Sequence, residues 1–222
     1  MNRRTFIHQV AAGAAATALA PSRLRGAPSA DLGPVKAEVG KRHDEAVRRL
    51  QDWIRQPSIA AENRGMNEGC ELTMQMLLEA GFNQVTKVPT DGQPGIFATL
   101  DAGAPRTLGL YFMYDVKQVD PKEWSSPPFE AALVDKPGFG KVVMGRGAVN
   151  QKGPEALFLA ALHAIRGSGR KLPVNFVFVG EGEEEIGSPT SHRSCAGPKC
   201  RLHSRNLLAS LCPPPHRGPT AR

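Results

Sequence analysis

A cluster of glutamates carries the first sign of chemistry in this sequence. Glu181, Glu183, Glu184 and Glu185 follow directly after the apolar run 174–179. Like charges this close repel one another, so the cluster favours a divalent cation that neutralises them. A carboxylate that does not bind the ion can act as a general base on a water molecule beside it. A solvated acidic loop is the alternative interpretation.

Two further polar stretches follow predicted strands. Asp115 comes just after the apolar run 107–113, and a glycine-rich turn, MGRGAVNQKGP, places Asn150 and Lys152 before a predicted helix. Ligands of open α/β sheets bind outside the carboxyl ends of the strands, so we expect Asp115, Asn150 and the glutamates to converge there. A tight glycine turn is the plain alternative for the second stretch. A phosphate-binding loop is disfavoured because the Walker spacing is absent.

Hydrophobic periodicity predicts the elements that position these residues. Helices are expected at 35–55, at 67–80 with Gly81 as the C-terminal cap, and at 153–165. Strands are expected at 84–88, 96–100, 107–113, 131–134, 142–144 and 174–179, and 107–113 reads as a fully buried strand. Strands that alternate with helices predict an α/β fold: a three-layer domain with a mostly parallel sheet flanked by helices.

Charge is distributed unevenly along the chain. The formal net charge is +7, but the first 30 residues carry four basic side chains and residues 190–222 carry six, with no acidic residue in either segment. Removing these ten charges leaves −3 for residues 31–189. A nucleic-acid-binding domain carries its basic patch on the folded body, so this class of partner is excluded.

The two ends of the chain differ from its body. The start, MNRRTFIHQVAAGAAATALAP, resembles a twin-arginine export signal, which predicts a signal peptide over 1–30 and a periplasmic or secreted protein. An amphipathic helix or a membrane anchor is the alternative, but its apolar stretch is too short to span a bilayer, and we expect no stable anchor. Residues 190–222 are rich in Pro, Arg, Ser and Cys without a period, which is typical of a disordered tail.

Three blocks in residues 35–189 resemble one enzyme family. They are YDVKQVDPKEWSSPPFE, GRGAVNQKGPEA and LPVNFVFVGEGEEEIGSP. They resemble the dinuclear zinc hydrolases that include aminoacylase, carnosine-type dipeptidases, acetylornithine deacetylase and succinyl-diaminopimelate desuccinylase. The resemblance implies two zinc ions and hydrolysis of an amide in a dipeptide or an N-acyl amino acid. It also implies that Glu184 is the general base and Glu185 a zinc ligand.

The chain departs from the family pattern at two ligand positions. Met113 stands where the family has a zinc-binding His, although Asp115, which would orient that His, is present. Asn150 stands where the family has an Asp that bridges both metals. A thioether is a weak zinc ligand and an amide brings no negative charge, so we expect weak zinc binding.

The family pattern also continues beyond residue 189, with a lid or dimerisation domain and a last ligand His. These are not recognisable in residues 190–222, so the resemblance implies a truncated catalytic domain that is a monomer. A non-catalytic remnant that binds a peptide or nothing is the alternative function.

Overall fold

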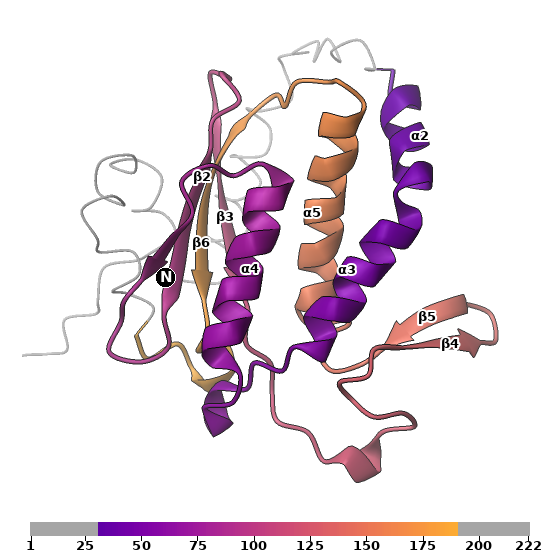
Figure 1. Cartoon of the computed structure of the whole chain (residues 1–222), viewed down its shortest axis with the longest axis vertical. Helices are drawn as coiled ribbons and strands as arrows, with labels where there is room; N and C mark the ends of the chain where they lie inside the picture. Colours follow the sequence, from indigo (N-terminus) through magenta and orange to yellow (C-terminus); the bar gives the residue numbers. More distant parts are fainter. Residues whose placement is uncertain (1–30, 191–222) are drawn as a thin grey trace, which may run out of the picture. The chain divides into compact units, whose positions relative to one another are not determined.

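The computed structural model describes residues 31–190, and the predictions for 1–30 and 191–222 lie outside the described residues. Figure 1 shows the elements. The helices are α2 (Gly33–Lys41), α3 (His43–Arg55), α4 (Met66–Ala80) and α5 (Lys152–Gly167), with 3-10 turns η1 (Ala60–Glu62), η2 (Pro121–Glu123) and η3 (Glu184–Ile186). The strands are β1 (Thr86–Val88), β2 (Gly95–Leu100), β3 (Thr107–Met113), β4 (Ala132–Lys136), β5 (Gly140–Met144) and β6 (Asn175–Glu181).

The main sheet has the strand order β1-β2-β6-β3. Strand β6 pairs with β3 in parallel and with β2 antiparallel, and β1 also pairs with β2 antiparallel. The predicted α/β class is confirmed, but the described sheet is mixed, with two of its three strand pairs antiparallel. The reason is that β1, β2 and β3 follow one another through short loops, whereas a parallel connection needs a crossover of about a dozen residues or more. Only α5, between β3 and β6, provides such a crossover within this sheet.

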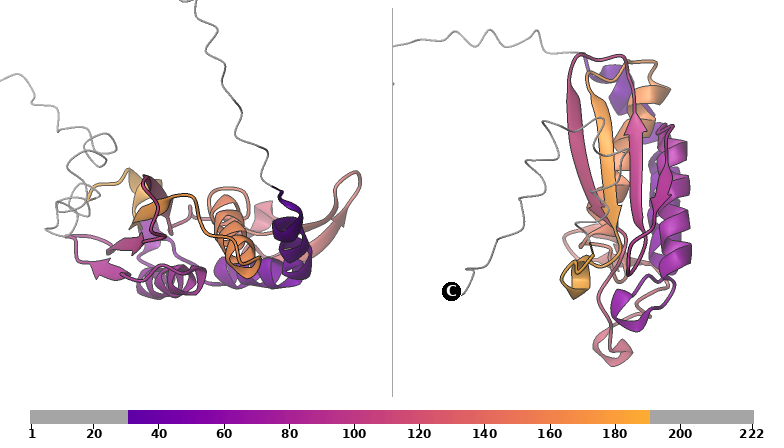
Figure 2. Two further views of the ribbon diagram at one scale, coloured as in Figure 1. Left: turned by 90° about the horizontal axis from the view of Figure 1, so that it is seen from above. Right: turned by 90° about the vertical axis from the view of Figure 1, so that its left-hand side faces the viewer.

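Helices α4 and α5 pack against one face of this sheet, as Figure 2 shows. Alternate side chains of the strands, including Phe112, Phe176 and Phe178, join the core formed with α3, α4 and α5. The other face carries a smaller apolar group of Phe97, Val177 and Val179. Residues 31–190 therefore form two layers, and they do not supply the third layer of the predicted three-layer arrangement.

Strand β3 has the predicted bounds but not the predicted burial. Leu108 and Tyr111 are about half exposed, and only Phe112 and Met113 are buried. The prediction of a fully buried strand was wrong because β3 lies at the edge of the described sheet, with β6 as its one strand neighbour. An apolar run by itself does not distinguish a central strand from an edge strand.

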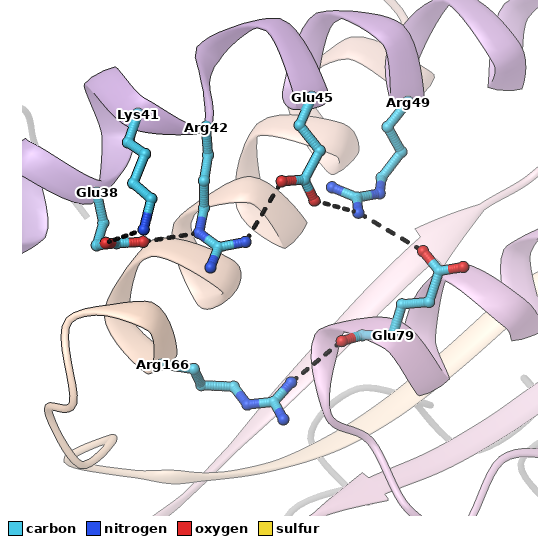
Figure 3. Close-up of polar contacts among 7 residues, drawn as sticks. All are labelled: Glu38, Lys41, Arg42, Glu45, Arg49, Glu79 and Arg166. Atoms are coloured by element: carbon cyan, nitrogen blue, oxygen red, sulfur yellow. Dashed lines mark hydrogen bonds and ion pairs between the residues drawn. The ribbon is translucent and has the colours of Figure 1, made fainter.

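The predicted helix over 35–55 is two helices, with a break at Arg42. Ion pairs cross this break and continue to α4, as Figure 3 shows. Arg42 pairs with Glu38 on one side and Glu45 on the other, at 2.8 and 3.3 Å. Arg49 then joins Glu45 at 2.9 Å and Glu79 of α4 at 3.6 Å. These pairs link α2, α3 and α4 to one another.

The helix predicted over 67–80 is α4, and its expected cap is confirmed. Gly81 has φ of +106°, and its N–H donates to the carbonyls of Leu77 and Leu78. The strands predicted near 131–134 and 142–144 pair with each other as a separate hairpin, β4–β5. This hairpin is tied to α3, where Gln51 Nε2 donates to the Ala131 carbonyl at 2.8 Å. Between residues 31 and 190 there is no helix with the length and apolar character needed to cross a bilayer.

Candidate active site

The candidate site lies where β3 and β6 end. The two strands are parallel and Met113 is in register with Glu181, so both chains leave the sheet at the same edge. The Tyr114 N–H extends this pairing by donating to the Glu181 carbonyl at 2.9 Å. The residues after the two strands therefore lie side by side, as the sequence predicted.

Asp115 connects the two strand ends directly. Its carboxylate is 1% exposed and accepts the backbone N–H of Glu184 on Oδ1 at 3.2 Å and that of Glu185 on Oδ2 at 3.0 Å. Burial raises the pKa of Asp115 to about 6, against the opposing effect of the two hydrogen bonds. Asp115 therefore positions the turn η3 that carries the Glu184–Glu185 pair.

Glu184 and Glu185 differ in their surroundings. Glu184 is exposed, whereas the side chain of Glu185 is only 11% exposed. Glu185 Oε1 accepts a hydrogen bond from Asn150 Nδ2 at 3.4 Å, and Oε2 lies 3.6 Å from the Lys117 ammonium. The structure thus joins Asp115, Asn150, Glu184 and Glu185, while Met113 is buried at the end of β3.

The other two glutamates of the cluster are structural. Glu181 and Glu183 are 5% and 6% exposed. Glu181 Oε1 accepts hydrogen bonds from the hydroxyls of Tyr111 and Ser188, and Glu183 accepts one from Thr190. The acidic cluster therefore divides into two buried carboxylates that hold the loop and two, the exposed Glu184 and the partly covered Glu185, that Asp115 holds at the strand ends.

Asn150 is brought to Glu185 by the glycine-rich turn. Gly147 has φ of +89°, in the left-handed region that favours glycine. A Cβ on Gly153 would lie 2.0 Å from the Ala148 carbonyl oxygen, so the first turn of α5 packs too closely for a side chain there. The turn geometry expected as the plain alternative is present, and it also places Asn150 at the site.

Two charged residues of α5 support the site from inside, and the sequence did not reveal that they are buried. Lys152 is fully buried and its Nζ donates to the carbonyls of Trp53 and Gln56, at 2.9 and 2.8 Å. Glu155 is 5% exposed and accepts the Met113 N–H at 3.0 Å. Burial lowers the pKa of Lys152 and raises the pKa of Glu155. The sequence did contain a signal of this burial: Lys152 and Glu155 are three positions apart, which places them on the same side of the helix as its apolar residues.

The described residues do not by themselves fit a pair of zinc ions. Within residues 31–190 no three His, Cys, Asp or Glu side chains are grouped as ligands of one ion. The donors that face the site are the carboxylate of Glu185 and the amide of Asn150, and the amide nitrogen is directed at that carboxylate. A zinc site in proteins has three or four protein ligands, so further ligands would have to come from outside this part of the chain.

Comparisons with known proteins point to one family of peptidases. Residues 110–211 match the model of Peptidase family M20/M25/M40, a range that runs past Thr190. Human Beta-Ala-His dipeptidase is 32% identical over 180 residues, which are 72% of this chain and 34% of that protein. Succinyl-diaminopimelate desuccinylase of Gluconacetobacter diazotrophicus is 34% identical over 146 residues, which are 63% of this chain and 35% of that enzyme.

A solved structure shows the same likeness. The crystal structure of human carnosine dipeptidase 1 superposes with a TM-score of 0.65 and 28% identity, over 76% of this chain and 38% of that one. The chain spans about a third of the length of the curated relatives it matches. The family resemblance and the fold expected from it are confirmed: residues 110–211 match Peptidase family M20/M25/M40, and the fold is that of the corresponding part of its dipeptidase members.

Proposed function

We propose that this chain is part of a metal-dependent hydrolase that cleaves the amide bond of a dipeptide or an N-acyl amino acid. The relatives named as a dipeptidase and a desuccinylase support this reaction class. The observation that carries the proposal is the pair of hydrogen bonds from the Glu184 and Glu185 backbone to Asp115. They hold an exposed carboxylate and a partly covered carboxylate next to each other at the strand ends, as acid–base chemistry beside a cation requires.

The residues of this chain divide the work. Glu184, with its exposed carboxylate, accepts a proton from the attacking water and returns it to the leaving amine. Asp115 is a positioning residue that orients the Glu184–Glu185 backbone. Glu185, with the oxygen of Asn150, would hold one divalent ion, and zinc is the family's metal. When bound, such an ion supplies positive charge that polarises an amide carbonyl and lowers the pKa of a water molecule.

A non-catalytic role is the second candidate, and one observation favours it. The carboxylate of Glu185 already has two partners in the chain, the Lys117 ammonium and the Asn150 amide. Its charge is therefore compensated without an ion. A domain whose site is satisfied in this way could bind a peptide without hydrolysing it.

Zinc binding and hydrolysis measured on the same samples separate the two candidates. The full chain is loaded with zinc and assayed with β-Ala-His and with an N-succinyl amino acid, beside the variants Glu184→Gln and Glu123→Gln. Glu123 is an exposed residue of η2 and serves as the control. We expect Glu184→Gln to retain the bound zinc and to lose turnover by a factor of about 100 or more. Zinc binding without turnover in the wild-type chain would support the non-catalytic role, and turnover unchanged in Glu184→Gln would refute the assignment of the base.

A further inference from the structure

We propose that Arg146 binds a carboxylate group of the substrate, and that the ring of Trp124 holds its guanidinium in place. This inference rests on the proposed function, because it names the part of a dipeptide or an N-acyl amino acid that is recognised beside the bond to be cleaved. It does not depend on a metal ion at Glu185. Arg146 belongs to the glycine-rich turn before α5, and Trp124 directly follows the turn η2.

The guanidinium of Arg146 is held in one orientation. Its Cζ lies 5.2 Å from the centroid of the Trp124 ring, and its Nη2 donates to the Gln118 carbonyl at 3.2 Å. The main chain is fixed as well, since the Arg146 N–H donates to the Pro128 carbonyl at 2.7 Å. A guanidinium stacked on an aromatic face keeps the N–H groups at its edge free to donate. Arg146 is therefore a preorganised donor that loses little conformational freedom when an acceptor binds.

The positive charge of Arg146 has no counter-charge within residues 31–190. Arg42, Arg49 and Arg64 each pair with a glutamate there, whereas no carboxylate of this part of the chain pairs with Arg146. The Arg146 Nε is also buried without a hydrogen-bond partner, and among the same residues Nη1 has no acceptor. A buried donor without an acceptor is unfavourable, and native structures leave few of them. An anion with oxygen acceptors would supply both the missing charge and a missing acceptor.

Two segments of the chain place Arg146 beside the candidate active site. Its acceptor Gln118 follows Lys117, whose ammonium lies 3.6 Å from Glu185 Oε2. Asn150, four positions after Arg146 in the same turn, contacts the other oxygen of Glu185 at 3.4 Å. Arg146 therefore lies on the border of the site, where it can bind a part of the substrate that does not react.

A carboxylate fits this position better than a phosphate. It carries one negative charge, which a single guanidinium neutralises, and its two oxygens match the guanidinium fork. A phosphate group carries more charge and would be repelled more strongly by Glu184 and Glu185. Two carboxylates of the proposed substrates have this chemistry: the C-terminal one of the amino acid, and that of an acidic acyl group such as succinyl.

The test is calorimetric titration of the full chain with matched acid and amide ligands. β-Ala-His and its C-terminal amide differ only in the C-terminal carboxylate, and N-succinyl-alaninamide and N-succinamoyl-alaninamide differ only in the acyl carboxylate. We expect the acid of one pair to bind about 10-fold more tightly than its amide, since hydrogen bonds to charged groups are the stronger ones. The pair that shows this preference identifies which carboxylate is bound.

Three variants assign the preference to Arg146. Arg146→Met should remove it, and Arg146→Lys should keep only part of it, because an ammonium keeps the charge but lacks the planar fork. Arg106→Met removes an exposed arginine that precedes β3 and should keep the whole preference, as a control for net charge. The ratio of acid to amide affinity is the decisive quantity, because a purely structural role of Arg146 would weaken both ligands equally.

The inference is overturned if neither acid binds the wild-type chain more tightly than its amide, or if Arg146→Met keeps the preference. Circular dichroism shows whether each variant is folded. If Arg146→Met does not fold, Arg146→Lys decides, and an unchanged ratio in that variant overturns the inference as well.

Hydrolysis assays on the same samples separate this inference from the proposed function. Turnover of the preferred acid with the same KM in the wild type and in Arg146→Met would leave the proposed function standing and refute the carboxylate site. A preference for the acid that Arg146→Met removes, without turnover by the wild-type chain, would support the carboxylate site and refute hydrolysis by this chain.

Discussion

The carboxylate of Asp115 accepts the backbone N–H of Glu185 at 3.0 Å, although the two residues are 70 positions apart in the sequence. The other carboxylate oxygen accepts the Glu184 N–H at 3.2 Å. One buried side chain therefore satisfies two donors of the turn that carries the proposed base and the proposed metal ligand. The site depends on this connection between the ends of β3 and β6 more than on any contact among the glutamates.

Asp115→Asn should weaken this connection. The amide offers one oxygen, so one of the two N–H groups must face an NH2 group. We expect the free energy of unfolding at pH 7 to fall by about 1–3 kcal/mol, the range for a buried donor left without its partner. Urea denaturation measures this change. The matched control is Asp120→Asn. Asp120 also accepts a backbone N–H, from Lys122 at 3.0 Å, but its side chain is exposed. Asn caps such a turn as well as Asp does, so this substitution should leave stability nearly unchanged. Equal effects of the two substitutions would contradict the role given to Asp115.

Glu155→Gln should change how stability depends on pH. Burial raises the pKa of Glu155 from 4.5 to about 8, so the folded chain keeps a proton that the unfolded chain releases. The stabilisation that Glu155 contributes to the folded state is fully present below about pH 4.5, and it is lost as the pH rises through about 8. Gln does not titrate and its oxygen can still accept the Met113 N–H. The variant should therefore gain stability relative to the wild type between pH 5 and 8, by at least about 1.4 kcal/mol, the equivalent of one pKa unit.

Denaturation midpoints across this pH range provide the measurement for Glu155. Lys152 and Asp115 are the charged groups whose fields act on Glu155, and both remain in the variant. Glu123→Gln, which alters an exposed carboxylate, should run parallel to the wild type. A Glu155→Gln curve that is also parallel would mean that Glu155 is ionised in the folded protein at neutral pH.

The sequence was sufficient for the parts of the fold that depend on local pattern. The bounds 107–113 of β3 and the cap at Gly81 follow from an apolar run and from a glycine in the left-handed region, and both are confirmed. The direction of β2 relative to β6 could not be read, because pairing partners are set by tertiary contacts. The break at Arg42 was also hidden, because it is slight: i, i+4 backbone hydrogen bonds continue across it, from the Arg42 N–H to Glu38 and from the Ala46 N–H to Arg42.

The candidate site was predictable where backbone topology alone brings residues together. Asp115 and the Glu184–Glu185 pair follow parallel strands that end at one sheet edge, and the structure brings them into contact. Asn150 follows the separate β4–β5 hairpin and reaches Glu185 through the turn before α5. The burial of Lys152 and Glu155 was missed, because a charged side chain is on the surface by default and only packing reveals the exceptions. The same applies to Glu181 and Glu183, which are buried and accept hydrogen bonds from the Tyr111 and Thr190 hydroxyls.

Gly182→Ala should destabilise the loop that carries the glutamates. A Cβ at this position would lie 2.3 Å from the hydroxyl oxygen of Tyr114, whose ring is buried and whose hydroxyl is held by the Pro94 carbonyl. Overpacking of this kind costs about 1–3 kcal/mol. Gly40→Ala in α2 is the control, because nothing lies within 4 Å of its Cβ and alanine is about 1 kcal/mol better than glycine in a helix. Thermal unfolding should therefore shift in opposite directions for the two variants, and a Gly182→Ala chain as stable as the wild type would show that Tyr114 can move aside.

The double variant Met113→His with Asn150→Asp should convert the site into a stronger metal site. It adds an imidazole at the end of β3 and a second carboxylate beside Glu185, and both are ligands that zinc prefers to a thioether and an amide. Without metal, the new Asp faces Glu185 at the 3.4 Å contact now made by an amide, so like-charge repulsion should lower the melting temperature. Zinc should reverse that loss and should bind at least about 10-fold more tightly than to the wild type, in line with the 10- to 100-fold effects of groups that support metal ligands. Met113→Leu with Asn150→Ala is the control, because it changes both positions without adding a ligand. If zinc raises the melting temperature of the double variant no more than that of this control, residues 113 and 150 do not face a common ion with Glu185.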